Sequence, residues 1–150
     1  MTEPRQPRPF QPNDRFFRLI PEVYIDDKHR RISPGAFSNT SGTLKMSVDW
    51  AHLSTPQESA KRWENTRAVG QFVQQDATDA LASDMPTVLP AELQNQQYDY
   101  DPIPNNRSHC NVTGKKPESV CKRFARVTKL VSWPSGWTVP DELATAMGDA

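Results

Sequence analysis

Large apolar side chains are scarce in this chain, and their scarcity limits the possible fold more than any other feature. Leu, Ile, Val and Phe make up 28 of the 150 residues, or 19%, which is near the level at which chains cease to fold. High net charge, the other mark of disorder, is absent because 18 basic residues match 18 acidic ones. We therefore expect one small folded domain with polar ends and long loops.

Proline divides the chain into regions. There are 14 Pro against 6 Gly, and four of the prolines fall within residues 1–13. We expect a flexible Pro-rich arm over 1–13, a single α+β domain over 14–137 and a polar tail over 138–150. The domain is expected to hold a small mixed β-sheet with about two helices packed against it.

Alternating apolar residues predict the strands of this sheet. Residues 15–20 are apolar on both faces, which indicates an interior strand. Strands are also predicted over 44–48, with Leu44 facing the core, over 68–74 and over 108–113. The segment 85–104 is rich in Pro, Gln, Asn and Asp and predicts a long loop, with one possible strand at 87–89.

Two helices are predicted. Thr55-Pro56-Gln57-Glu58 has the residues of a capping box with Pro in the first turn, and predicts a helix to about Thr66. Residues 117–131 carry apolar side chains at helical spacing, with basic side chains around most of the remaining circumference.

Composition restricts the partners and the compartment. A formal net charge of zero argues against general electrostatic attraction to nucleic acid or to anionic lipid. No apolar run approaches the ~18 residues of a membrane helix, and the N-terminal residues do not resemble a secretory signal. The two cysteines, Cys110 and Cys121, are expected to be free thiols in a reducing cytoplasm.

Common catalytic motifs are missing from the sequence. It contains no phosphate-binding Gly-x-x-x-x-Gly-Lys loop, no Gly-x-Gly-x-x-Gly, no Gly-x-Ser-x-Gly and no Cys-x-x-Cys. His109 and Cys110 are neighbours on a predicted strand, so their side chains point to opposite faces and are poorly placed to share a metal ion. We expect no metal and no cofactor.

Arg18 is the most informative single residue. Its guanidinium lies between Phe16 and Ile20 on a predicted interior strand, and a buried cation needs a partner. That partner is a carboxylate such as Asp49 or a bound anionic ligand; alternatively the strand lies at an edge and Arg18 is solvated. His109 has a side chain suited to acid–base chemistry near neutral pH, although a lone histidine on a polar strand face is usually only an exposed or hydrogen-bonded side chain.

A second set of residues has the composition of a binding surface, because aromatic rings and arginine are common at interfaces. The candidate partner-binding residues are Trp50, Tyr98, Tyr100, Trp133, Trp137, Arg123 and Arg126. The basic residues of 117–131 form either the solvated side of a helix or a contact for nucleic acid.

Four motifs resemble a small uncharacterised bacterial protein family. They are Phe-Arg-Leu-Ile-Pro at 17–21, Ile-Ser-Pro-x-Ala-Phe at 32–37, Met-Ser-Val-Asp at 46–49 and Pro-x-Asn-x-x-His at 104–109. The resemblance covers about residues 15–130 and implies no particular activity. A weaker likeness is to ADP-ribosyltransferase and RNA 2′-phosphotransferase folds, where Arg18, Ser47 and His109 would be the matching catalytic positions. The Glu-x-Glu signature of those transferases is missing here.

These observations predict a non-enzymatic accessory subunit that binds a protein partner in a bacterial cytoplasmic assembly. The alternatives are a nucleotide-handling enzyme that uses Arg18, Ser47 and His109, and a protein that contacts nucleic acid through helix 117–131. Convergence of those three side chains in one pocket would favour the enzyme.

Overall fold

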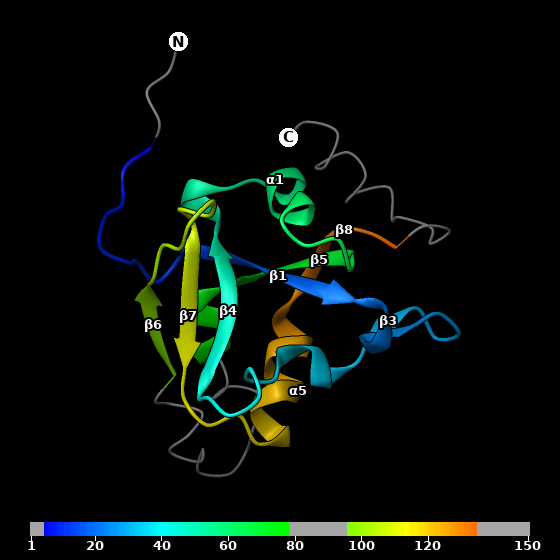
Figure 1. The fold of residues 1–150 in the computed structure, drawn as a ribbon. Coiled ribbons are helices and arrows are strands. Elements are labelled where there is room, and N and C mark those ends of the chain that lie inside the picture. The colour runs from blue at the N-terminus through cyan, green and yellow to red at the C-terminus, as the bar shows by residue number, and fades with distance from the viewer. Residues whose placement is uncertain (1–4, 79–95, 135–150) are drawn as a thin grey trace.

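Six antiparallel strands form the main sheet of the computed structural model, which describes residues 5–78 and 96–134 (Figure 1). Their order across the sheet is β6-β7-β4-β1-β5-β8. The strands are β1 (Arg15–Pro21), β4 (Lys45–Trp50), β5 (Thr66–Val73), β6 (Gln97–Tyr100), β7 (His109–Thr113) and β8 (Lys129–Ser132). The α+β class is confirmed, and β1 is an interior strand between β4 and β5 as predicted.

Helices and short turns cover the two faces of the sheet (Figure 1). A small sheet of β2 (Ile25–Asp26) and β3 (Arg31–Ile32) lies between two 3-10 turns, η1 (Glu22–Tyr24) and η2 (Pro34–Phe37). A third turn, η3 (Ala51–Leu53), leads into α1 (Pro56–Lys61), and the remaining helices are α2 (Gln74–Thr78) and α5 (Glu118–Val127). α5 packs beside η2, whereas α1 contacts β1 and β5.

Aromatic rings supply most of the volume of the core. Phe16, Trp50 and Phe72 lie side by side on β1, β4 and β5 and are 0–1% exposed. Phe124 of α5 meets Phe72 edge-on, with ring centroids 5.2 Å apart, and stacks on Phe37 of η2 at 6.1 Å. Large rings bury more area per residue than aliphatic side chains, so few residues suffice to close one face of the sheet.

The Pro-rich N-terminal residues take part in this packing. The Phe10 ring lies 4.7 Å from the Trp50 ring, and Arg8 forms an ion pair with Asp14 at 2.7 Å. Trp50, one of the candidates for a partner-binding surface, is therefore not at the surface, since Phe10 and Tyr100 cover an indole that is 0% exposed.

The capping box at Thr55 is confirmed, because its hydroxyl accepts a hydrogen bond from the Glu58 backbone N–H at 3.2 Å. Both predicted helices are shorter than expected. α1 ends at Lys61, and β5 begins at Thr66, the residue to which the helix was predicted to run. The other, α5, ends at Val127, since the next β-branched residue, Thr128, adopts an extended conformation and Leu130 pairs with Gly70 in the sheet.

Two further predictions need correction. Part of the loop predicted over 85–104 is a strand, β6, which pairs with β7 and brings Tyr98 and Tyr100 against the core; the possible strand at 87–89 lies outside the described residues. Leu44, predicted to face the core, is 52% exposed because β4 begins one residue later.

Gly70 allows β8 and the end of α5 to approach β5 closely. A Cβ added at Gly70 would lie 2.5 Å from Cγ2 of Thr128, a distance at which one of the two groups must move. No other residue fits this position without displacing Thr128.

We predict that Gly70→Ala lowers the free energy of unfolding by about 1–3 kcal/mol, the usual range for overpacking. Thr128→Ser removes the obstructing methyl group and keeps the hydroxyl that donates to the Phe124 carbonyl. In a double-mutant cycle measured by urea denaturation, the Gly70→Ala penalty should shrink in the Thr128→Ser background. Equal penalties in both backgrounds would show that this contact is not the constraint.

Candidate functional site

The three residues singled out as a catalytic set line one cavity. Arg18 of β1, Ser47 of β4 and His109 of β7 all contribute to a hollow of about 490 Å3. The rest of its wall comes from the segment after η2, the residues after α1 and the loop between β6 and β7. Three positions separated by up to 91 residues of sequence, between Arg18 and His109, are therefore brought together by the sheet.

The cavity exists because β1 and β4 separate. They pair only through Phe16 with Trp50 and Phe17 with Asp49, whereas β1 pairs with β5 along its whole length. The two strands run in widely different directions beyond that point (Figure 1). Separation leaves backbone carbonyl groups of β4 without a strand partner, and such groups need another donor.

Arg18 supplies that donor. Its Nη1 donates to the Ser47 carbonyl at 2.8 Å, and its Nε donates to the Ala36 carbonyl at 2.8 Å. The guanidinium thus joins β1, β4 and η2 at the place where the sheet opens. Burial lowers the pKa of Arg18 to about 10, so the group still carries its positive charge at neutral pH.

The carboxylate partner expected for Arg18 is not Asp49. Among residues 5–78 and 96–134, no carboxylate lies within ion-pair distance of the Arg18 guanidinium. Backbone carbonyls hold it, and they carry only partial negative charge. A cation with this environment at the wall of a cavity is suited to bind an anionic group.

Ser47 and His109 form a hydrogen-bonded pair in the same cavity. The Ser47 hydroxyl lies 3.2 Å from His109 Nε2, and His109 Nδ1 lies 2.7 Å from the backbone carbonyl oxygen of Asp101. A carbonyl oxygen only accepts hydrogen bonds, so Nδ1 carries the proton in the neutral ring. Nε2 is then the basic nitrogen, and it faces the serine hydroxyl.

Asp101 adds a carboxylate to this pair. Its Oδ2 lies 3.7 Å from His109 Nδ1 and accepts a hydrogen bond from Asn111 at 2.8 Å. The order Ser47, His109, Asp101 is that of a nucleophile, a base and a group that orients the base.

Asp49 holds the surrounding frame in place. Its carboxylate is 6% exposed, pairs with Arg62 at 3.0 Å and accepts from the Asn106 side chain at 2.8 Å. Arg62 follows α1 and Asn106 lies in the loop before β7, so one carboxylate joins two walls of the cavity to β4.

The rim of the cavity carries two exposed apolar side chains. Trp63 is 39% exposed and Ile103 is 44% exposed, and both line the hollow. A substrate with an apolar portion would find contact area there while its anionic group lies against Arg18.

Sequence reasoning missed Asp101, Asn106 and Arg62. Asn106 is the Asn of the Pro-x-Asn-x-x-His motif at 104–109, so that motif could have identified it as a candidate site residue. Nothing in the pattern marked Asp101 or Arg62, because their roles depend on the pairing of β6 with β7 and on where α1 ends.

Cysteine and histidine do not gather at the site. Within the described residues, no three His, Cys, Asp or Glu side chains lie together as metal ligands. Cys110 is 0% exposed on the core face, and burial raises the pKa of its thiol to about 12. His52, close in sequence to Ser47, instead contacts the Gln6 carbonyl at 2.7 Å.

The candidate partner-binding residues are spread over several environments. Arg123 was expected on an exposed basic stripe, but it is 3% exposed and its Nη2 donates to the Asp76 carbonyl at 2.6 Å, which corrects that prediction. Tyr98, Tyr100 and Trp133 are half-buried against the core, and Arg126 is exposed. Trp137 lies outside the described residues.

Comparison of the chain with protein-family models, with curated proteins and with solved structures gave no match. Across residues 5–78 and 96–134, no helix has the length and apolar character required to cross a membrane.

We predict that Asp49→Asn lowers the free energy of unfolding by about 3 kcal/mol, because it removes the buried one of the two carboxylates that pair with the partly buried Arg62 cation. Glu58→Gln is the matched control, since Glu58 contacts the same arginine at 3.8 Å but is 60% exposed. That change should cost less than about 0.5 kcal/mol. Equal losses for the two variants in urea denaturation would contradict the role assigned to Asp49.

Proposed function

We propose that the chain is an enzyme that hydrolyses an ester or transfers its acyl group to another alcohol. Ser47 is the nucleophile, His109 is the general base, and Arg18 contacts an anionic part of the substrate. One observation carries this proposal. His109 Nδ1 is bound to the Asp101 carbonyl at 2.7 Å, which leaves Nε2 as the acceptor 3.2 Å from the Ser47 hydroxyl.

The reaction follows from these contacts. Ser47 Oγ attacks the electrophilic carbon of the ester while His109 Nε2 accepts the hydroxyl proton. The same proton then passes from Nε2 to the oxygen of the leaving alcohol as the ester bond breaks. Water, or another alcohol in a transfer reaction, attacks the acyl-serine in a second step with the same proton movements, and free Ser47 is restored.

Arg18 serves this chemistry through its charge. Its guanidinium already donates to the Ser47 carbonyl, so a fixed positive charge lies beside the nucleophilic residue. Negative charge that develops near Ser47 is stabilised by a cation that does not have to reorient. The same cation favours substrates that carry a carboxylate or a phosphate.

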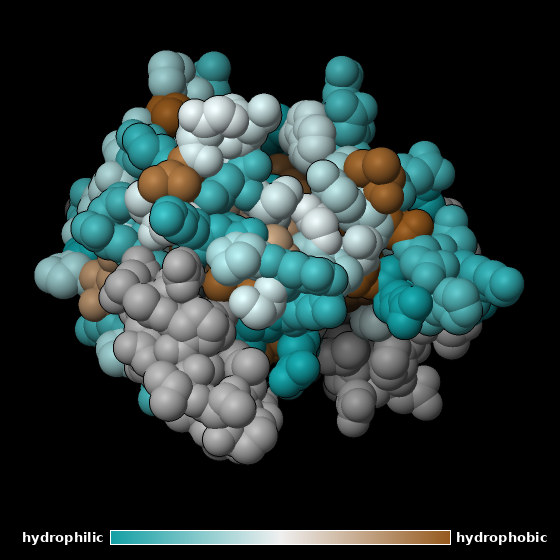
Figure 2. All heavy atoms as spheres, turned by 90° about the horizontal axis from the view of Figure 1, so that it is seen from below, coloured by the Kyte–Doolittle hydropathy of each residue, from teal (hydrophilic) through white to brown (hydrophobic). Residues whose placement is uncertain are grey.

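An accessory role without catalysis has weaker support. It depended on exposed aromatic rings, and Trp50 is fully buried while Tyr98 and Tyr100 pack against the core. The described part of the face seen in Figure 2 is mostly hydrophilic, with apolar side chains in separate small patches. Stable protein interfaces generally need a larger continuous apolar centre.

The test is labelling by a fluorophosphonate, which forms a covalent bond with a serine that a base has activated. We expect one adduct on the intact protein by mass spectrometry, located at Ser47 by peptide mapping. Ser47→Ala and His109→Gln should each reduce labelling at least about tenfold while the circular dichroism spectrum stays native.

Ser38→Ala is the matched control, because Ser38 also lines the cavity but its hydroxyl donates to the Gly35 carbonyl. This variant should label like the unmodified protein. Lack of an adduct on the unmodified protein, or labelling that survives in folded His109→Gln, would overturn the proposal.

A further inference from the structure

A second hollow, on a different part of the molecule, combines cations with an apolar floor. It has a volume of about 330 Å3 and lies between β3, the C-terminal end of α5 and β8. We call it the basic groove, and its defining residues are Arg30, Arg31, Lys129, Leu130 and Trp133. No carboxylate among residues 5–78 and 96–134 lines it.

The part of the chain that the structure describes is much more basic than the whole. All 18 Lys and Arg residues fall within residues 5–78 and 96–134, but 11 of the 18 acidic residues do, so this part carries a formal charge of +7. A net charge of zero for the whole chain was expected to argue against attraction to polyanions. That expectation does not hold for the part that forms the groove.

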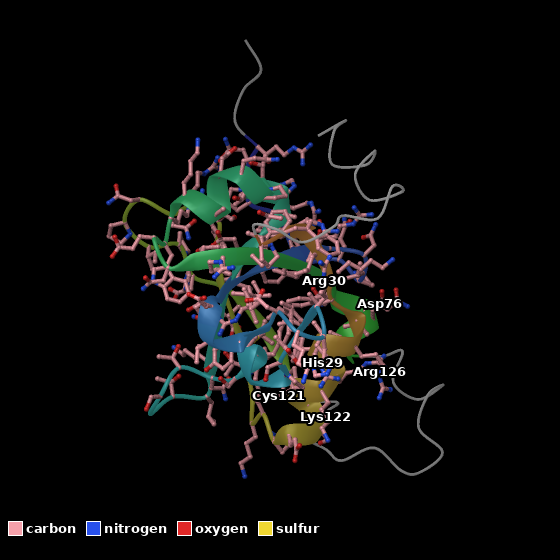
Figure 3. The ribbon with its side chains drawn as sticks, turned by 90° about the vertical axis from the view of Figure 1, so that its right-hand side faces the viewer. His29, Arg30, Asp76, Cys121, Lys122 and Arg126 are labelled. Carbon is pink, nitrogen blue, oxygen red and sulfur yellow. The ribbon has the colours of Figure 1, made fainter. Side chains whose placement is uncertain are left out.

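The positive surface extends beyond the groove along α5. Lys122 and Arg126 are exposed on this helix, four residues or about 6 Å apart along its axis. Figure 3 shows them on the same side of the molecule as His29 and Arg30. A row of cations longer than the groove suits a chain with repeated negative charges better than one small anion.

Most of these cations have no carboxylate partner among the residues that the structure describes. In the described part of the chain, Arg30, Arg126 and Lys129 have no carboxylate within ion-pair distance. Arg31 pairs with Asp26 at 3.4 Å and Lys122 with Glu118 at 3.1 Å, both pairs being largely exposed. Exposed pairs of this kind contribute little to stability, so they exchange readily for an external anion.

The apolar floor of the groove favours a polyanion that also has an exposed apolar ring. Trp133 is half-buried beside the cations and offers its ring at the floor, where Leu130 is 9% exposed. A sulfated sugar or a duplex presents charge without a free apolar face, whereas an unpaired base offers both a flat ring and an adjacent phosphate.

We propose that the basic groove binds single-stranded nucleic acid, with its phosphates on Arg30, Arg31 and Lys129 and a base against the apolar floor. This site is separate from the cavity of Ser47 and His109, which shares none of its residues. The proposal therefore stands or fails independently of the ester chemistry.

Fluorescence anisotropy with a labelled oligothymidylate of about 15 nucleotides tests the proposal. Binding should weaken as salt rises, with a slope of about −0.7 per phosphate contacted in a plot of log affinity against log salt. The variant with Arg30→Gln, Arg31→Gln and Lys129→Gln should bind at least tenfold more weakly, and its slope should be smaller by about 2.

The matched control carries Lys45→Gln, Lys61→Gln and Lys115→Gln, which removes the same charge from exposed positions outside the groove. It should bind within about threefold of the unmodified protein. Equal losses in the two triple variants would mean diffuse attraction rather than a site. A duplex of the same length or heparin binding as tightly as the oligothymidylate would also overturn the proposal, since neither presents a free base.

Discussion

The guanidinium of Arg18 is the contact on which the rest of the site depends. β1 and β4 part after two residue pairs, and separation of two interior strands leaves polar backbone groups exposed inside the domain. Arg18 restores their hydrogen bonding by spanning to Ser47 and Ala36. The opening then persists as a cavity, and the residue that keeps it open also carries the charge at its wall.

The net charge of the described residues differs from that of the whole chain, and this difference affects both the cavity and the basic groove. The described residues carry a formal +7 that the composition of the whole chain conceals. At the cavity, Asp49 neutralises Arg62 but Arg18 has no such partner among those residues. At the basic groove, two arginines and one lysine lie around an apolar floor. Both hollows are thus suited to anions, although one offers a nucleophile and the other a surface.

Local patterns in the sequence predicted the parts that depend on local physics. Alternation identified β1, β4, β5 and β7, and the capping box identified the start of α1, because burial and hydrogen bonding within a few residues decide those features. The end of α5 and the strand β6 were missed, since both depend on pairing with distant strands. For the same reason Arg18, Ser47 and His109 were recognisable as candidates, while Asp101 and Arg62 were not.

The protonation of His109 tests the central claim most directly, namely that Arg18 holds Ser47 where His109 receives its proton. Nitrogen-15 NMR of the imidazole, in the unmodified protein and in Arg18→Met, reports which ring nitrogen bears hydrogen. The geometry predicts hydrogen on Nδ1 in both proteins, because the Asp101 carbonyl fixes it, and a changed Nε2 chemical shift in Arg18→Met, where Ser47 no longer donates to Nε2. Hydrogen on Nε2 in the unmodified protein, or an unchanged spectrum in Arg18→Met, would contradict the account.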